Sequence, residues 1–197
     1  MRKQSRTRYA VLGMLSLGDM SGYQIKKHIA ESIAHFWSES YGQLYPELAR
    51  MTKEGLTSVK PERGKAGRSR KTYSLTRKGA GELRTWLQAP VREEPPRSEL
   101  LLKLFFGNSA PSDANIGNVT EFRDRHMQLL KVYDGITRHL QAKCANDPNL
   151  PFWLITLNFG RHRSQALLKW ADETIKVLES EKGHQVGKER TLRQLKS

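Results

Sequence analysis

The first 88 residues combine helical and extended patterns in an order that few folds accommodate. Three segments with apolar residues at helical spacing come first, at residues 9–17, 22–36 and 40–55. Two short segments with β-branched residues follow, at residues 56–59 and 72–75, and a basic loop containing glycine and proline joins them. The order helix, helix, helix, strand, basic loop, strand predicts a winged helix-turn-helix module.

Capping signals mark where these helices begin. Ser21 is predicted to be the N-cap of the second helix. Ser40 and Gln43 have the spacing of a capping box, in which the two side chains satisfy free backbone N–H groups. Pro46 would remove a hydrogen bond from a helix interior, so the third helix is placed to start near Ser40, with Pro46 in or just past its first turn. Thr76 is predicted to cap a fourth helix.

A proline-rich stretch divides the chain. Residues 89–96 contain three prolines, which stop a helix and favour an extended linker. Beyond it, Ser98 is predicted to cap a short apolar helix that ends at Gly107. Residues 109–117 are predicted to form a loop or a frayed turn.

Two long helices are predicted in the second half, over residues 118–143 and 152–181. Their apolar residues recur at the spacing of a coiled-coil seam, which indicates a two-fold interface between two copies. Gly160 and Ser164 are small enough to let a partner backbone approach closely. The residues predicted to form the dimer interface are Phe122, Leu129, Tyr133, Ile136, Trp153, Leu157, Leu168, Ile175 and Leu178.

These elements predict a mainly α fold with a small β-hairpin, in the α+β class. We expect a winged helix-turn-helix domain over residues 1–90 and a helical dimerisation domain over residues 91–182. Residues 183–197 are basic and polar and are expected to form a disordered tail.

The positive charge is concentrated in the N-terminal half. The formal net charge is +14; residues 1–88 hold 17 Lys and Arg against 7 Asp and Glu, whereas residues 89–197 hold 17 against 13. This distribution is expected of a region that meets a polyanion, although the same charge can simply serve solubility.

The basic loop and the strand ends around it carry the densest charge. Within residues 60–78 a single acid, Glu62, accompanies eight basic residues. Such a cluster at the tip of a strand pair favours contact with DNA phosphates, and the alternative is a solvated loop. The eight residues are Lys60, Arg63, Lys65, Arg68, Arg70, Lys71, Arg77 and Lys78.

The third helix is predicted to turn an apolar stripe inward, formed by Tyr41, Leu44, Leu48 and Met51. Its other side is predicted to present Gly42, Gln43, Pro46, Glu47 and Arg50. Gln43 has the chemistry to read adenine, but its amide is also claimed by the capping box. Tyr45, at the edge of the stripe, is either a contact to a phosphate or a thymine methyl, or a core residue.

The motifs of common enzymes and metal sites are missing from the sequence. Residues 64–67 lack P-loop spacing and do not lead from a strand into a helix. The six histidines form no His-Glu-x-x-His pattern, and no Gly-x-Ser-x-Gly elbow is present. We therefore expect no enzymatic activity, no cofactor and no metal site.

Cellular location is expected to be the cytoplasm. Cys144 is the single cysteine, which suits a reducing compartment. No apolar run approaches the roughly 18 residues that span a bilayer. The basic residues 1–8 precede an apolar stretch that has no small-residue cleavage site, which argues against a signal peptide.

Five stretches of the first 107 residues form a recognisable set: Tyr9–Leu15, Met20–Lys26, His35–Leu48, Lys71–Gly79 and Arg97–Gly107. Together they resemble the PadR family of bacterial transcriptional regulators. The residues beyond them are similar, through their helix pattern, to the C-terminal domain of the subgroup that includes the phenolic-acid repressors and the AphA-type virulence activator.

The resemblance implies a homodimeric winged helix that binds inverted-repeat DNA and usually represses a nearby operon. It places the segment around Tyr41 and Gln43 in the DNA groove and the basic loop on the phosphates. The candidate DNA-binding residues are Ser21, Tyr23, Tyr41, Gln43, Tyr45, Pro46, Arg50, Lys65, Arg68, Arg70 and Lys71.

Some members of the resembled family release DNA when a phenolic acid or another aromatic compound binds. Aromatic residues near the predicted domain junction could wall such an effector pocket, or could simply be packing. The candidate effector-binding residues are Tyr9, His35, Trp37 and Trp153. Two other functions stay open: an activator or co-regulator with a protein partner, and a non-specific nucleoid or RNA-binding protein.

Overall fold

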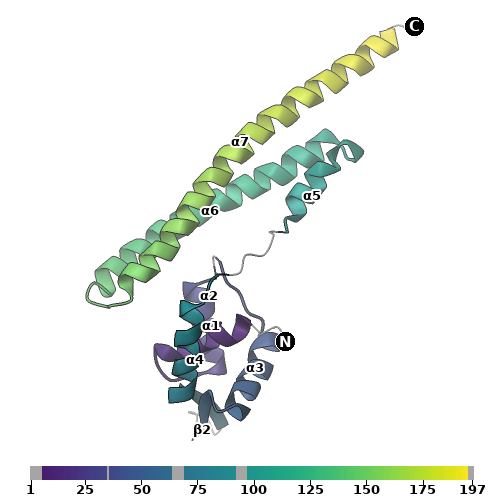
Figure 1. Ribbon diagram of the computed structural model, residues 1–197. Coiled ribbons are helices and arrows are strands. Elements are labelled where there is room, and N and C mark those ends of the chain that lie inside the picture. Colours follow the sequence, from purple (N-terminus) through teal and green to yellow (C-terminus); the bar gives the residue numbers. More distant parts are fainter. Residues whose placement is uncertain (1–5, 35, 64–68, 92–96, 195–197) are drawn as a thin grey trace. The chain divides into compact units, whose positions relative to one another are not determined.

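The computed structural model describes residues 6–34, 36–63, 69–91 and 97–194. By its internal contacts the chain splits into two compact units, Met1–Glu93 (unit 1) and Glu94–Ser197 (unit 2). The described residues are mostly helical, with one small antiparallel sheet in unit 1 (Figure 1). This confirms the predicted mainly α fold with a small β part.

Unit 1 has the predicted order of three helices, a β-hairpin and a fourth helix. Its sheet has the strand order β1-β3-β2, and both pairings are antiparallel. The strand β1 was not predicted, and it pairs Met20 with Tyr73 and Ser21 with Thr72. The elements are α1 (Arg6–Ser16), β1 (Met20–Ser21), α2 (Gly22–Ser32), α3 (Tyr41–Lys53), β2 (Thr57–Arg63), β3 (Ser69–Leu75) and α4 (Arg77–Gln88).

The predicted caps start the helices of unit 1. The hydroxyl of Ser40 accepts a hydrogen bond from the Gln43 backbone N–H at 3.2 Å, and Gln43 Oε1 accepts one from the Ser40 N–H at 3.0 Å. This reciprocal pair is the predicted capping box of α3. Ser21 caps α2, and Thr76 caps α4 by accepting from the Gly79 N–H at 3.0 Å. Pro46 lies inside α3, past its first turn.

The core of unit 1 lies where α1, α2 and α3 meet the sheet. Two glycines shape the corners around it. Gly55, with φ of 74°, turns the chain out of α3 in a left-handed conformation that suits glycine. At Gly79 an added Cβ would lie 2.2 Å from the Leu56 carbonyl oxygen, so glycine lets α4 start against the hairpin. The largest fully buried side chains here are Val11, Leu12, Ile25, Ile29, Leu44, Leu48, Met51 and Leu56.

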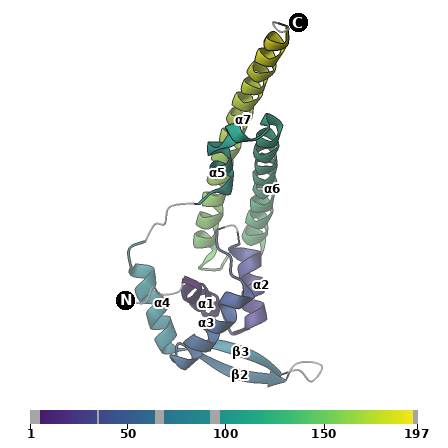
Figure 2. The same ribbon diagram turned by 90° about the vertical axis from the view of Figure 1, so that its right-hand side faces the viewer.

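Two boundaries in unit 1 differ from the sequence prediction. The strands of the hairpin run to Arg63 and from Ser69, well into the predicted basic loop (Figure 2). Ladder hydrogen bonding therefore overrides the loop signals of Pro61 and the polar residues around it. The helix α2 ends at Ser32 rather than near Phe36, because the chain turns at Ile33, whose carbonyl accepts from the N–H groups of Phe36 and Trp37.

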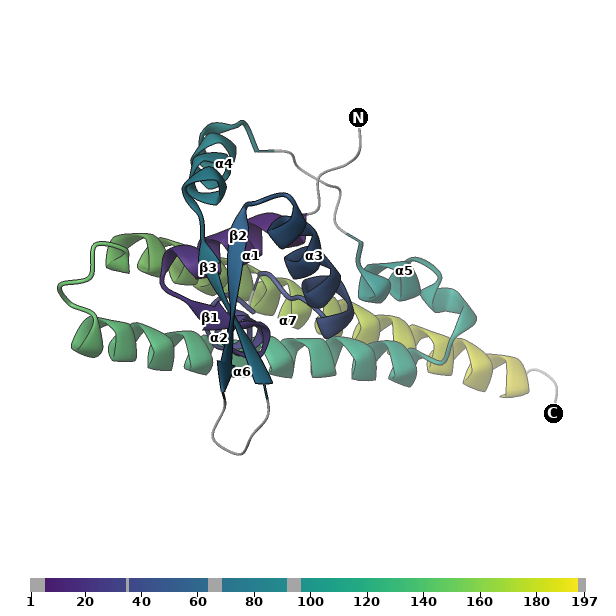
Figure 3. The ribbon, with the colours of Figure 1, turned by 90° about the horizontal axis from the view of Figure 1, so that it is seen from below.

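Unit 2 is built around a helical hairpin. The helices α6 and α7 run side by side in opposite directions, and α5 lies beside the start of α6 (Figure 3). Ser98 caps α5 as predicted, accepting from the Leu101 N–H at 3.3 Å. The elements are α5 (Glu99–Phe105), the 3-10 turn η1 (Gly107–Ser109), α6 (Ser112–Lys143) and α7 (Leu150–Gln194).

Both long helices are longer than predicted. The helix α6 starts at Ser112 and not near residue 118, and the Asn115 side chain ties its first turns to the Gly107 carbonyl at 2.8 Å. The helix α7 continues to Gln194, so the backbone of residues 183–194, which we expected to be disordered, is helical. Residues 195–197 lie outside the described part of the chain.

Candidate nucleic-acid interface

The exposed face of α3 carries two stacked tyrosines. Tyr41 and Tyr45 are 45% and 46% exposed, and their ring centroids are 5.9 Å apart. The Tyr45 ring also covers Gly22 at the start of α2, where an added Cβ would lie 2.6 Å from Tyr45 Cε1. Tyr45 is therefore a surface residue whose ring is held by its neighbours, and not part of the core.

Gln43 takes part in the capping box, which is one of the two roles that the sequence left open for it. It lies on the exposed side of α3, but its Oε1 accepts hydrogen bonds from the Ser40 N–H and from the Ser40 hydroxyl, the latter at 2.8 Å. The amide oxygen is thus used by the capping box. Among the described residues no protein acceptor is found for the amide NH₂, which is left as a donor toward a ligand on this face.

Two residues at the start of α2 differ in availability. Tyr23 is 60% exposed. Ser21 is only 4% exposed, and its hydroxyl accepts from the Gln24 N–H at 3.3 Å. The Ser21 side chain is thus used in the capping box of α2, and its contact with DNA stays a prediction.

A buried arginine connects α1 to α3 and α4. Arg8 Nε donates to Glu47 Oε1 at 3.0 Å, Nη2 lies 2.8 Å from Glu54 Oε2, and Nη1 lies 3.2 Å from Glu82 Oε1. Burial alone disfavours the charged guanidinium, but the bonds to the three carboxylates outweigh it and raise the pKa of Arg8. Glu47 and Glu54 lie two turns apart, in α3 and at its C-terminal end, so the ion pairs fix that helix against α1.

The sequence did not reveal this role of Glu47. We placed Glu47 on the outward side of α3, yet it is 2% exposed and faces Arg8. Its second oxygen, Oε2, accepts from Arg50 Nη1 at 2.8 Å. The Arg50 side chain is 53% exposed, and Pro46 lies exposed one turn before it. The outward face of α3 is therefore two tyrosines, Gln43, Pro46 and Arg50.

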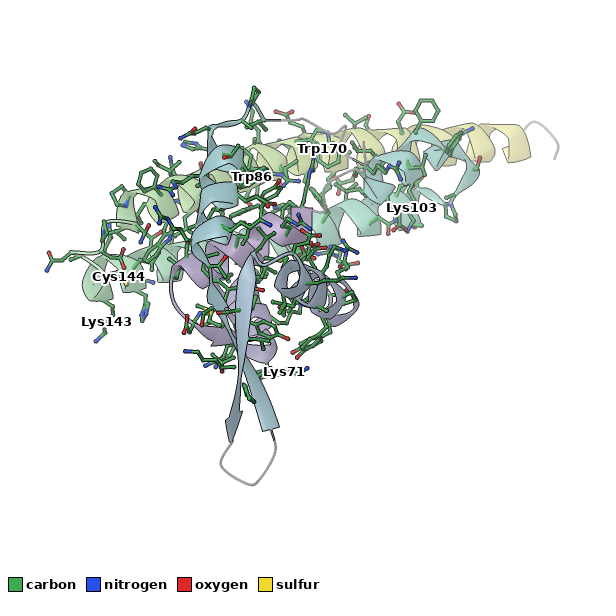
Figure 4. All side chains as sticks on the ribbon, turned by 60° about the horizontal axis from the view of Figure 1, so that its bottom comes forward. Lys71, Trp86, Lys103, Lys143, Cys144 and Trp170 are labelled. Carbon is green, nitrogen blue, oxygen red and sulfur yellow. The ribbon has the colours of Figure 1, made fainter. Side chains whose placement is uncertain are left out.

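The β-hairpin extends away from the helices of unit 1 (Figure 2). Lys71 is exposed on β3, opposite Pro61 of β2 (Figure 4). Arg70 precedes it in β3 and pairs through its backbone with Glu62. The candidates Lys65 and Arg68 lie outside the described residues.

One residue of the basic cluster serves the protein itself. Lys78 Nζ donates to the Glu54 carbonyl at 2.7 Å, at the C-terminal end of α3. A cation at this end of a helix is favourable because the last carbonyls are free and the helix dipole is negative there. Lys78 thus stabilises α3 through an exposed contact, and Lys60 and Lys71 are exposed on the hairpin itself.

The candidate effector residues have separate partners. Tyr9 is 7% exposed and stacks on Trp86, with ring centroids 4.4 Å apart. Burial, and then the nearby Glu82, raise the pKa of the Tyr9 phenol. Trp37 Nε1 donates to the buried carboxylate of Glu39 at 2.8 Å. Trp153 is half-buried in unit 2, and His35 lies outside the described residues.

The seam predicted to join two copies is used within one chain. Tyr133 of α6 packs over Gly160 of α7, His126 Nδ1 lies 3.1 Å from Ser164 Oγ, and the Phe122 ring meets the Trp170 ring. Gly160 and Ser164 do allow close approach, but the partner is α6 of the same chain. The other predicted dimer residues are buried or half-buried along this hairpin: Leu129, Ile136, Trp153, Leu157, Leu168, Ile175 and Leu178.

The apolar residues that unit 2 leaves exposed are a different set. On α5 and just after it the side chains are mostly in water, with Phe105 82% exposed. A second group lies at the start of α7 at the spacing of one helix face. The sequence prediction missed both groups because it assigned the longest apolar stripe to the partner chain. The members of the two groups are Leu101, Leu102, Phe105, Phe106, Phe152, Ile155 and Phe159.

Two further observations concern the described residues only. No helix among them is long and apolar enough to cross a membrane. No group of three or more His, Cys, Asp and Glu side chains within the same residues is arranged to hold a metal ion.

Family models match both halves of the chain. Residues 11–85 match the transcriptional regulator PadR-like family, and residues 96–179 match the virulence activator alpha C-terminal domain.

Two characterised proteins are similar over most of their length. The negative transcriptional regulator PadR of Bacillus subtilis is 25% identical over 182 residues, which are 88% of this chain and 98% of that protein. Its crystal structure with operator DNA has a TM-score of 0.74 at 26% identity, covering 87% of this chain and 98% of that one. Its structure with p-coumaric acid has a TM-score of 0.69 at 27% identity, covering 88% and 99%. The Vibrio cholerae virulence activator AphA has a TM-score of 0.71 at 27% identity, covering 89% and 99%.

Proposed function

Because the chain belongs to the PadR-like family of transcriptional regulators, we propose that it is a homodimeric repressor that binds an inverted-repeat operator. Its proposed activity is DNA binding and not catalysis, and the protein is proposed to be cytoplasmic and associated with the nucleoid when bound to its operator. The Bacillus subtilis relative, a negative regulator crystallised with operator DNA, supports this proposal.

The observation that carries the proposal is the outward face of α3. It presents Tyr41, Tyr45 and Arg50 from a helix whose start is capped and whose body is anchored to Arg8. A rigid helix with exposed aromatic and polar side chains is what major-groove readout requires. The hairpin beside it adds Lys60 and Lys71 for phosphate contacts.

The exposed apolar residues of unit 2 support the dimer. Phe105 and Phe106 at α5 and Phe159 at the start of α7 would remain in water in a monomer, and exposed apolar residues grouped on a surface mark protein interfaces. A homodimer carries two copies of α3, and binding to successive major grooves requires these helices to lie about 34–36 Å apart. That spacing requires a pseudo-palindromic operator.

A small aromatic acid is the proposed effector, as suggested by the p-coumaric acid complex of the Bacillus subtilis relative. Tyr9 and Trp37 are candidates for contact with it, together with His35 and Trp153. Release of DNA requires that the effector bind the released arrangement of the two winged-helix domains with higher affinity than the DNA-bound arrangement. The internal partners of Tyr9 and Trp37 mean that such a ligand would have to displace or extend an existing contact.

Activation is the second candidate function. It is favoured by the match of residues 96–179 to the domain named for a virulence activator, and by the similarity to AphA. Transcription from the regulated promoter, with and without the protein, separates the two: the proposed repressor lowers transcript levels, whereas an activator raises them.

The test of DNA recognition is anisotropy binding to the duplex upstream of the chain's own gene, against a scrambled duplex, across a salt series. A preference of about 10³-fold or more, with a steep loss of affinity as salt rises, supports a sequence-specific regulator. Equal binding to both duplexes at every salt concentration, repeated with duplexes selected from random sequence, would leave only a non-specific nucleic-acid-binding role. No binding even at low salt would overturn the proposal.

A further inference from the structure

We infer that Glu47 is a positioning residue for DNA binding: its buried carboxylate holds Arg50 in the orientation that meets a DNA phosphate. The inference rests on the proposed DNA-binding function and adds to it a residue that does not itself touch DNA. Glu47 was not among the candidate DNA-binding residues, and its side chain faces inward.

The geometry joins an interior arginine to an exposed one through a single carboxylate. Glu47 Oε1 accepts from Arg8 Nε at 3.0 Å, and Oε2 accepts from Arg50 Nη1 at 2.8 Å. The exposed fraction of the side chain is 11% for Arg8 and 3% for Glu47, and it reaches 53% for Arg50. These contacts form an Arg8–Glu47–Arg50 relay, in which Arg8 is fixed in the core and Arg50 reaches the surface of α3.

The buried arginine makes Glu47 compatible with a DNA-facing surface. A carboxylate near DNA normally repels phosphates, but the charge of Glu47 is shared by Arg8 from inside and Arg50 from outside. Arg8 in turn is fixed by Glu54 and Glu82, so it does not depend on Glu47 alone. The carboxylate can therefore orient Arg50 without presenting a free negative charge to the groove.

The position of Arg50 indicates a phosphate partner and not a base. The N-terminal residues of a recognition helix usually reach the base edges, whereas Arg50 lies in the last turn of α3. One guanidinium nitrogen is held by Glu47, and the remaining donors stay available for a charge-assisted contact. Holding a flexible side chain before binding removes part of the entropy cost of fixing it on DNA.

A double-mutant cycle on a single duplex tests the coupling, and non-specific DNA at low salt is sufficient. Arg50→Gln should weaken binding about tenfold and lower the salt slope by about 0.9, as loss of one phosphate contact predicts. Glu47→Gln should weaken binding about three- to tenfold when Arg50 is present, and should have no effect when it is combined with Arg50→Gln.

Glu54→Gln is the matched control. Glu54 also binds Arg8 but is not bonded to Arg50, and its side chain is 40% exposed. This variant should keep wild-type DNA affinity even if its thermal stability falls as far as that of Glu47→Gln. Equal loss of DNA binding in both carboxylate variants would assign the effect to general anchoring of α3 and overturn the positioning role. An increase in affinity for Glu47→Gln, or a loss that persists when Arg50→Gln is already present, would also overturn it.

A measurement on the wild-type protein without DNA covers the case in which Glu47→Gln fails to fold. Nε relaxation of arginine side chains by NMR should show Arg50 more ordered than Arg84, an exposed arginine of α4 for which no ion pair is found among the described residues. Equal mobility of the two side chains would contradict positioning by Glu47. If the wild type binds no duplex but Arg50 is ordered, the proposed function fails while the structural relay stands.

Discussion

The ring of Tyr133 on α6 lies directly over the α-carbon of Gly160 on α7. A Cβ added at Gly160 would be 2.9 Å from Tyr133 Cζ, which is closer than side-chain contacts allow. Tyr133 is only 3% exposed, so its ring has little room to move. The glycine is therefore what permits the two helices of the hairpin to approach at this level.

Gly160→Ala is expected to destabilise unit 2 relative to a matched glycine variant. Alanine gains about 1 kcal/mol of helix propensity in either helix, so the reference is Gly135→Ala on α6, where an added Cβ meets nothing within 4 Å. The Gly160 variant should be less stable than the Gly135 variant by about 1–3 kcal/mol, the usual cost of overpacking. Urea unfolding of both proteins measures this difference, and equal stability would show that the hairpin opens to accept the methyl group.

Lys71→Gln is expected to reduce the salt dependence of DNA binding. Lys71 is exposed on the β-hairpin (Figure 4), and loss of one phosphate contact lowers the slope of log K against log salt by about 0.9. Affinity should fall to a similar extent for specific and scrambled duplexes, since phosphate contacts carry no sequence information.

Lys143→Gln provides the control for that experiment. Lys143 is also an exposed lysine, but it lies in unit 2 at the end of α6 (Figure 4). Its removal changes net charge by the same amount and should leave the salt slope unchanged. If both variants lower the slope equally, the hairpin lysine acts only through overall charge.

Phe105→Glu is expected to weaken the proposed dimer. Phe105 is 82% exposed on α5, and a glutamate at the core of an interface leaves a charge without a partner. We expect a loss of about 2 kcal/mol or more in dimer stability, as for an interface hot spot. Sedimentation equilibrium measures it, with Leu87→Glu on α4 as the control because Leu87 is 66% exposed in unit 1. A dimer of unchanged stability would move the interface away from α5.

Local signals were sufficient to predict where most elements start. Ser21, Ser40, Thr76 and Ser98 were all identified as N-caps, because a cap depends on residues within one turn of the chain. Element ends were predicted less well. The hairpin is longer than expected since cross-strand pairing, which depends on both strands at once, outweighs the loop preference of Pro61.

The candidate site shows the same limit. Helix periodicity placed Tyr41 on the inward apolar stripe of the third helix, yet its side chain is 45% exposed. The candidate status of Tyr41 and Tyr23 at the DNA came from the family resemblance and not from periodicity. Glu47 was placed on the outward side by the same periodicity, but it is buried, because its orientation is decided by the ion pair with Arg8, a residue far away in the sequence. Likewise an apolar seam shows that α6 and α7 each need a partner, but not whether that partner is the same chain.

His126 is expected to make unit 2 less stable in mild acid. Its imidazole lies between α6 and α7, and burial lowers its pKa, with the charges of Arg163 and Arg125 acting in the same direction. Below the ordinary value of 6.5 the unfolded chain therefore binds a proton that the folded chain resists. The stability that the neutral imidazole contributes to the folded state is present in full above pH 6.5, and it is lost as pH falls toward the lowered pKa of the folded state.

His126→Asn keeps a polar group near Ser164 but does not titrate. The free energy of unfolding of the wild type relative to this variant should therefore decrease as pH is lowered from about pH 7.5 to about pH 5. Urea unfolding at a series of pH values measures the difference, and a difference that stays constant would show that the folded protein leaves the pKa of His126 unchanged.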